Sequence, residues 1–344
     1  MDLKVAFLIE SWGPPWNEGY KNLAKYIYEM LKTRLNIDVF EKNSSLTEQH
    51  NYDVVWIFNY PENLTTIFKL LNLKRINNAI VKEVAKKELD VGFRSKIKTL
   101  LLRRKLWDVI VTTTDLLKSE LARFINDRRI FTLPPPIPVD YFKPLNKYRS
   151  KEVLGFEEDK IYIGYTGTIN KYRRLDIVFK AIKNVALKNV VFVLALTNIQ
   201  GKELGAVIRE VRKAWVPLKF IITHDVRILY SSLDMLIYPV EREGSIEPPL
   251  TILEAMSCGT PVATLRNPIT KKIIRDRLDG FLFNSPYELR TIIEEVLEDT
   301  LNKSKISVNA RKRIIEMFDS KKLERRYLEF LKTLGTSRRR NSPC

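Results

Sequence analysis

The chain has 344 residues, 45% of them hydrophobic, and its 59 Lys and Arg against 41 Asp and Glu give a formal net charge of +18. This length exceeds the usual size of one domain, so two domains are expected. Two cysteines and two histidines exclude a disulfide framework and leave no basis for a metal cluster. The positive net charge predicts an anionic partner. Three kinds of partner fit: a nucleotide, an anionic membrane surface or nucleic acid.

The first half of the chain alternates between two kinds of pattern. Short apolar runs of strand length and helical patterns follow one another in this order: strand 4–9, helix 20–35, strands 37–40 and 53–58, helix 64–73, strand 108–112. Such alternation is typical of a parallel sheet with helices on both faces. The loop after the first run ends at Gly19 and lacks the Gly-x-Gly-x-x-Gly spacing of a dinucleotide site.

Residues 91–107 carry six basic and no acidic side chains among Leu, Ile, Phe and Trp. A basic amphipathic segment of this kind lies on an anionic membrane surface in some proteins and packs on a sheet with a solvated basic face in others. Both interpretations stay open. No apolar run approaches the roughly 18 residues of a membrane span, and no signal peptide precedes the first strand, so a cytosolic chain is expected.

A proline cluster marks the domain boundary. Four of the five residues from Pro134 to Pro138 are prolines, which continue neither a helix nor a central strand. We therefore place a first domain at 1–144 and a second at 145–318. Helical patterns close the chain, the last at 320–334, and the basic tail 335–344 is expected to be disordered.

The segment 241–263 reads as a loop, a short helix and a buried strand. Pro248 and Pro249 suit a first helical turn and Gly259 suits the position after a helix end, which predicts a helix over 248–258. Glu247 and Glu254, seven residues apart, would lie on one stripe of that helix, and its N-terminus would receive an anion. An ordinary buried helix with a solvated acidic end is the alternative.

The segment from Glu254 to Val262, EAMSCGTPV, resembles the signature of family GT4 of the retaining glycosyltransferases with the GT-B fold. Three further stretches resemble the family at matching places: the linker 139–144, the strand and turn ending at Gly167, and 229–239 before the signature. The resemblance implies two Rossmann-like doubly wound domains with a cleft between them. It places the acceptor on the first domain and the nucleotide sugar on the second, and it implies that a helix at 319–334 crosses back to the first domain.

The resemblance also implies roles for individual residues. The second signature glutamate, Glu254, would bind the ribose and the first would bind the sugar hydroxyls. The family has seven residues between the two, whereas Glu247 and Glu254 have six, so the first role falls to Glu247 or to Glu243; we favour Glu247, and with Arg173 we take it as catalytic. The residues implied to bind the nucleotide sugar are Gly19, Gly167, Thr168, Lys171, Leu250, Thr251 and Glu254. Thr168 stands where the family has arginine and Arg173 where it has lysine.

The activity that the resemblance implies is transfer of a hexose, with retention, from a UDP- or GDP-sugar to a glycan, lipid-linked or other hydroxyl acceptor. The family's lipid-linked acceptors favour contact of 91–107 with the inner face of the membrane. No metal or other cofactor is implied. A GT-B protein that binds nucleotide sugars without transferring them is one alternative. A basic nucleic-acid-binding protein is the other, but no aromatic-basic motif supports it and no nucleic acid is expected.

Overall fold

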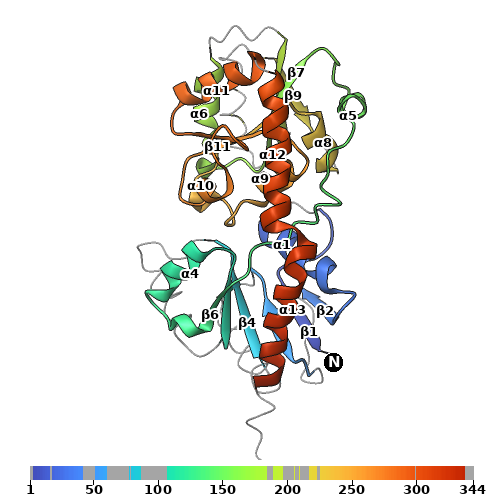
Figure 1. Cartoon of the computed structure of the whole chain (residues 1–344), viewed down its shortest axis with the longest axis vertical. Helices are drawn as coiled ribbons and strands as arrows, with labels where there is room; N and C mark the ends of the chain where they lie inside the picture. The colour runs from blue at the N-terminus through green and yellow to red at the C-terminus, as the bar shows by residue number, and fades with distance from the viewer. Residues whose placement is uncertain are drawn as a thin grey trace, which may run out of the picture. The chain divides into compact units, whose positions relative to one another are not determined.

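The computed structural model describes residues 3–15, 18–41, 51–59, 77, 79–86, 107–183, 189–196, 205, 209, 217–222, 225–298 and 300–337. The chain divides into two compact units (Figure 1), of which the first comprises 1–138 with 318–344 and the second comprises 139–317. The division follows Pro138, within the proline cluster. No helix of the described residues is both long enough and apolar enough to cross a membrane.

The first unit is built on a six-stranded sheet in the order β2-β1-β3-β4-β5-β6, with every neighbouring pair parallel. Its strands are β1 (Lys4–Ile9), β2 (Asn36–Glu41), β3 (Val54–Ile57), β4 (Ala79–Val84), β5 (Val109–Thr112) and β6 (Ile130–Thr132). Its helices are α1 (Gly19–Leu31), α4 (Asp115–Ala122), the 3-10 turn η1 (Asp127–Arg129) and α13 (Ser320–Ser337).

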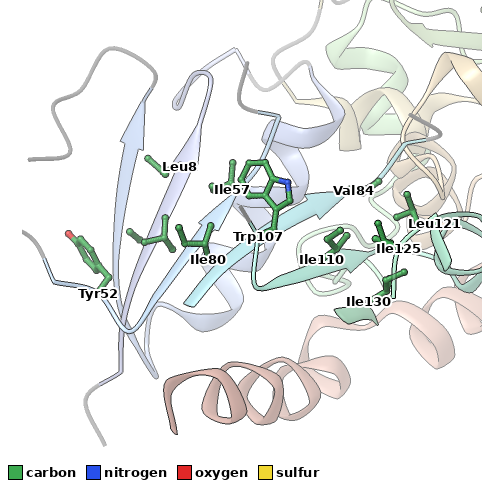
Figure 2. Packing of buried hydrophobic residues seen from close by; sticks show 12 residues of the cluster. Leu8, Tyr52, Ile57, Ile80, Val84, Trp107, Ile110, Leu121, Ile125 and Ile130 are labelled. Carbon is green, nitrogen blue, oxygen red and sulfur yellow. The ribbon is translucent and has the colours of Figure 1, made fainter. Parts of the chain in front are cut away.

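Successive side chains of a strand point to opposite faces of a sheet, and in the central strands β1, β3, β4 and β5 nearly every residue is buried, so both faces of this part of the sheet are covered. On one face, side chains of β1, β3, β4 and β5 meet Leu121 and Ile125 from α4 and the turn after it (Figure 2). On the other face, Trp56 of β3 stacks on Tyr327 of α13 at 6.1 Å between ring centroids. The Tyr327 hydroxyl donates to the carbonyl oxygen of Pro134 at 2.9 Å. The C-terminal helix is thereby part of the first unit.

The second unit repeats this plan with a six-stranded parallel sheet in the order β12-β11-β10-β7-β8-β9. Its strands are β7 (Ile161–Gly167), β8 (Val190–Leu196), β9 (Leu218–Ile221), β10 (Met235–Tyr238), β11 (Val262–Leu265) and β12 (Phe281–Phe283). Its helical elements are α5 (Lys147–Val153), η2 (Lys171–Arg173), α6 (Leu175–Ile182), α8 (Val226–Ser232), η3 (Arg242–Gly244), α9 (Leu250–Ser257), α10 (Thr270–Ile273), α11 (Pro286–Glu298) and α12 (Thr300–Phe318).

One consequence of the strand order places the candidate site. β7 and β10 are neighbours and run parallel, with Met235 paired to Ile163. Their carboxyl ends therefore open on the same edge of the sheet, which is the edge where open α/β sheets bind ligands. The loop with η2 follows β7, and the loop with η3 leads from β10 to α9.

The structure corrects several predictions. The helix predicted over 248–258 is α9, which begins at Leu250 with Pro249 as its N-cap. Glu247 therefore lies in the preceding loop and does not share a helical face with Glu254. The strands β4, β6 and β12 were not predicted. Residues 335–337, predicted to be disordered, continue α13.

Other predictions fall outside the described residues. They are the helix at 64–73, the tail 338–344 and the amphipathic segment 91–106 with its two interpretations; only Trp107 of that segment is described, and its side chain is buried in the core of the first unit.

Candidate functional site

The loop after β7 begins at a glycine that the backbone requires. Gly167 has φ of +125°, a conformation that side-chain-bearing residues rarely adopt. A Cβ on it would meet the hydroxyl of Tyr165 at 3.6 Å and the ring of Tyr238 at 3.9 Å. The next residue, Thr168, accepts a hydrogen bond at its carbonyl oxygen from the Tyr165 hydroxyl. The turn thus lies directly against two tyrosine rings.

Arg173, at the end of η2, is 9% exposed. Its Nη1 donates to the hydroxyl of Tyr238, and its guanidinium carbon lies 4.8 Å from the centre of the Tyr238 ring. Its Nε is buried and has no hydrogen-bond partner among the described residues. Arg173, which was predicted to be catalytic, therefore keeps one unused donor in a buried position, where an unsatisfied donor is costly.

The two other basic residues of this loop are engaged differently. Lys171 is exposed, with its ammonium nitrogen 4.8 Å from the centre of the Tyr172 ring. Arg174 donates to Asp176 at 3.0 and 3.1 Å and to Glu241 at 2.9 Å. These hydrogen bonds to Asp176 and then to Glu241 raise the pKa of Arg174, so its charge is permanent but locally neutralised.

The loops carrying η2 and η3 pack on each other. The backbone N–H of Glu241 donates to the carbonyl oxygen of Tyr172 at 2.8 Å. A Cβ on Gly244 would lie 2.7 Å from the Cβ of Tyr172, so only glycine permits this approach. The structure thereby brings Gly167, Thr168, Lys171 and Arg173 to the loop that leads into the signature helix.

Glu247 is 2% exposed and forms an ion pair with Arg242 of η3. Arg242 Nε donates to Oε1 at 2.5 Å and Nη2 donates to Oε2 at 3.0 Å. The two side chains line a hollow of about 10 Å³, the size of a water molecule, together with Pro249 at the start of α9. Glu243, the alternative first glutamate, lies in η3 and is partly exposed.

Helix α9 presents the remaining residues. Its internal hydrogen bonds begin with Ile252 N donating to Pro249 O at 3.1 Å, so the N–H groups of Leu250 and Thr251 belong to the first turn, which lacks intrahelical acceptors. Glu254 is 4% exposed and its Oε2 accepts from the hydroxyl of Tyr230 at 3.1 Å. Burial, and then the Glu254 carboxylate, raise the pKa of Tyr230 well above its ordinary value, so the hydroxyl stays protonated and donates.

Gly19 belongs to the first unit, where it is the first residue of α1 and follows the loop after β1. Glu18 before it accepts from the Asn59 Nδ2 at 2.8 Å, and burial followed by repulsion from Glu10 raises the pKa of Glu18. This group stands at the carboxyl ends of β1 and β3. Within the described residues, no group of three or more His, Cys, Asp or Glu side chains is arranged to hold a metal ion.

The second unit matches a known protein family. Residues 146–313 match the model of the family described as glycosyl transferases group 1. The matched segment makes up nearly all of the second unit. The match covers β7, η2, α8 and α9, and so includes every predicted site residue except Gly19.

Curated relatives of the glycosyltransferase domain match over part of their length. D-inositol 3-phosphate glycosyltransferase of Geodermatophilus obscurus is 25% identical over 186 residues, which are 49% of this chain and 40% of the relative. O-antigen chain mannosyltransferase B of Escherichia coli is 26% identical over 206 residues, 55% of this chain and 51% of the relative. The chain spans about half the length of these relatives or less.

Solved structures extend the likeness to both units. The crystal structure of Anabaena HepE in complex with UDP-glucose has a TM-score of 0.80 at 14% identity and covers 96% of this chain and 100% of that chain. With two parallel six-stranded sheets flanked by helices, the predicted GT-B fold of two Rossmann-like domains is confirmed.

Four side chains around the candidate site were not predicted from the sequence. They are Tyr165, Tyr230, Tyr238 and Arg242. Three are tyrosines within apolar runs, where a ring is expected in any core and the direction of the hydroxyl is invisible. Arg242 stands five residues before Glu247 in an irregular loop, and no periodicity predicts contact across such a loop.

Proposed function

We propose that the chain is a retaining glycosyltransferase that moves a hexose from a nucleoside diphosphate sugar, UDP- or GDP-linked, to a hydroxyl acceptor. The family of the second unit and the GT-B fold support nucleotide-sugar chemistry. The single observation that carries the assignment of residues is the convergence, at one edge of the second sheet, of the buried cation Arg173 with the loop of Glu247 and the helix of Glu254.

In this proposal the second unit binds the donor. Glu254 accepts hydrogen bonds from the ribose hydroxyls, and Glu247, oriented by Arg242, accepts from hydroxyls of the sugar. Arg173 donates to the diphosphate through its unpartnered Nε, because guanidinium N–H groups match phosphate oxygens in geometry and charge. The amides of Leu250 and Thr251 and the ammonium of Lys171 add positive potential at the same edge.

The chemistry follows from where charge develops. Cleavage of the anomeric C–O bond leaves negative charge on the diphosphate, and positive groups already in place stabilise that charge without reorganisation. The departing phosphate oxygen takes the proton of the acceptor hydroxyl on the same face of the sugar, which retains the anomeric configuration and requires no carboxylate nucleophile. The preformed cations do in this scheme what a metal ion does elsewhere, and we propose that no cofactor is needed.

The acceptor is proposed to bind the first unit, and Gly19, the first residue of α1, is proposed to contact the ligands. One relative is named as an O-antigen chain mannosyltransferase, which favours a glycan or lipid-linked acceptor here. Attachment to an anionic membrane surface through 91–107 is part of the same proposal, and so is action in the cytoplasm or on the inner face of the membrane.

A non-transferring GT-B protein is the second candidate, and one observation favours it. Both oxygens of Glu247 are held by Arg242, and Arg174 is held by two carboxylates, so two groups near the donor position already have partners. A protein of this second kind would bind nucleotide sugars and release no transfer product.

Thermal unfolding against UDP-, GDP- and ADP-sugars, with Glu254→Ala in parallel, tests the donor site. A ligand at a hundred times its Kd stabilises the folded state by about 2.7 kcal/mol, and we expect one nucleotide to do so only in the wild type. NMR of the product formed by that donor with a glycan acceptor then reads the anomeric configuration. An inverted product contradicts retention, stabilisation without any product selects the second candidate, and no stabilisation by any donor contradicts both.

A further inference from the structure

Two adjacent arginines have opposite surroundings: Arg173 is the last residue of η2, and Arg174 is the cap residue that follows it. Arg174 is paired with Asp176 and Glu241, and it is 36% exposed at its side chain. Arg173 is buried, and no carboxylate of the described part of the chain pairs with it; its partners are the hydroxyl and ring of Tyr238. A buried guanidinium without a counter-anion lowers stability, because burial removes its hydration and no opposite charge compensates for that loss.

Phenols hold a guanidinium in a way that carboxylates do not. A tyrosine hydroxyl is neutral near pH 7, so it accepts a hydrogen bond from the guanidinium without cancelling its charge. The face of the ring attracts the cation through its quadrupole. The partners of Arg173 therefore fix its position while they leave its full positive charge for another anion.

The second tyrosine supports the first. The rings of Tyr165 and Tyr238 lie 6.2 Å apart at an interplanar angle of 16°, and both are buried. The Tyr165 hydroxyl is tied to the carbonyl oxygen of Thr168, so the ring that backs Tyr238 is anchored to the same loop. Tyr238 has little freedom to change its rotamer, and its hydroxyl defines where Nη1 of Arg173 lies.

We infer that Tyr238, backed by Tyr165, is a positioning residue that keeps Arg173 fixed and un-neutralised for the diphosphate of a nucleotide sugar. This inference rests on the proposed function, because the diphosphate is the anion for which Arg173 is kept. The unpartnered Nε of Arg173 is the donor that the ligand would satisfy.

The test is the affinity of the full chain for UDP, GDP and ADP, measured by calorimetry for the wild type and Tyr238→Phe. The Phe variant keeps the ring and removes only the hydroxyl. For the nucleotide that binds best, we expect about tenfold weaker binding, the size of one lost hydrogen bond to a charged group. Ligand-observed NMR should show that the corresponding nucleoside, which lacks phosphate, binds both proteins equally.

Two further variants separate positioning from general damage. Tyr162→Phe removes a buried hydroxyl from β7, the strand of Tyr165 and the neighbour of the strand of Tyr238. This hydroxyl accepts from the N–H of Glu157 at 2.8 Å, and its removal should leave diphosphate affinity unchanged. In an Arg173→Lys background, Tyr238→Phe should change diphosphate affinity little, because the coupled partner is already gone.

Unchanged diphosphate affinity in Tyr238→Phe overturns the inference while the proposed donor site stands. Equal losses for nucleoside and diphosphate also overturn it, since they report a distorted site. If the wild type binds none of the three nucleotides, the proposed function is wrong, and the inference is wrong as well because it rests on that function.

Discussion

Arg242 and Glu247 form a buried bidentate ion pair, with side chains 14% and 2% exposed. The pair closes the loop between β10 and α9 and fixes the carboxylate in front of the helix N-terminus. A buried carboxylate is tolerated only when its charge is paired and its oxygens are hydrogen-bonded. The pair therefore makes the loop conformation and the place of Glu247 depend on each other.

Arg242→Met should lower the free energy of unfolding by about 3 kcal/mol, because it leaves the Glu247 carboxylate buried without its partner. Urea denaturation measures this loss. The matched control is Arg277→Met, which breaks a pair with Glu295 whose side chains are 49% and 36% exposed; such pairs contribute about 0.5 kcal/mol. Equal losses in the two variants would show that Glu247 finds water or another donor once Arg242 is gone.

The carboxylate of Glu254 should distinguish ribose from deoxyribose. Tyr230 donates to one of its oxygens at 3.1 Å, and an ionised carboxylate accepts several hydrogen bonds, to which the proposed ribose hydroxyls would add. Glu254→Gln should weaken binding of the preferred ribonucleoside diphosphate about tenfold. It should affect the 2′,3′-dideoxy analogue much less, so the ratio of the two Kd values in calorimetry is the measurement. A loss that is equal for both ligands would place Glu254 away from the ribose.

The sequence predicts much of this site because its motifs are local. The parallel α/β class and the strand and turn ending at Gly167 follow from apolar runs and glycines, whereas the GT-B fold was implied by the family resemblance; the structure has that strand and turn at the predicted residues. The start of α9 does not follow, because Pro248 and Pro249 suit a first turn and an extended approach equally well. Pro249 takes extended dihedrals as N-cap, which moves Glu247 off the helix.

The missed strand β4 has a different cause. Its sequence AIVKEV places Lys82 and Glu83 side by side in a central strand, where both faces are buried. Consecutive charges normally indicate an exposed segment. Here the ammonium nitrogen of Lys82 lies over the Trp107 ring, and the Trp56 indole N–H donates to Glu83. These tertiary contacts stabilise two charged side chains in a buried strand, which the composition of the segment does not predict.

The close approach of the η2 and η3 loops should be sensitive to one methyl group. Gly244→Ala would place a Cβ 2.7 Å from that of Tyr172, and both atoms belong to rigid backbone positions. We expect a loss of about 1–3 kcal/mol in unfolding free energy and weaker binding of nucleoside diphosphates, because Arg173 adjoins Tyr172. Ser245→Ala, one residue further on, is the control and should change neither quantity by much. Unaltered nucleotide affinity in Gly244→Ala would mean that the two loops do not act together in binding.

Glu83 should make the stability of the first unit depend on pH. It is fully buried, and burial raises its pKa to about 8, against smaller opposing effects of the Trp56 N–H and of Lys82; Tyr327 lies on the same side. Because the folded pKa exceeds the ordinary value of 4.5, the folded state binds the proton more tightly than the unfolded state. The contribution of Glu83 to stability should therefore be greatest near pH 5 and should fall as the pH rises from about 5 through 8.

Glu83→Gln keeps the acceptor for the Trp56 indole N–H and removes the titration. Its urea midpoint should change less between pH 5 and 9 than that of the wild type, and the two curves should diverge most on the alkaline side. Glu329→Gln serves as control, because the Glu329 side chain on α13 is 60% accessible and this variant should keep the pH profile of the wild type. Parallel profiles for the wild type and Glu83→Gln would mean that Glu83 is ionised in the folded protein at neutral pH, with Lys82 as the neighbouring charge that compensates for it.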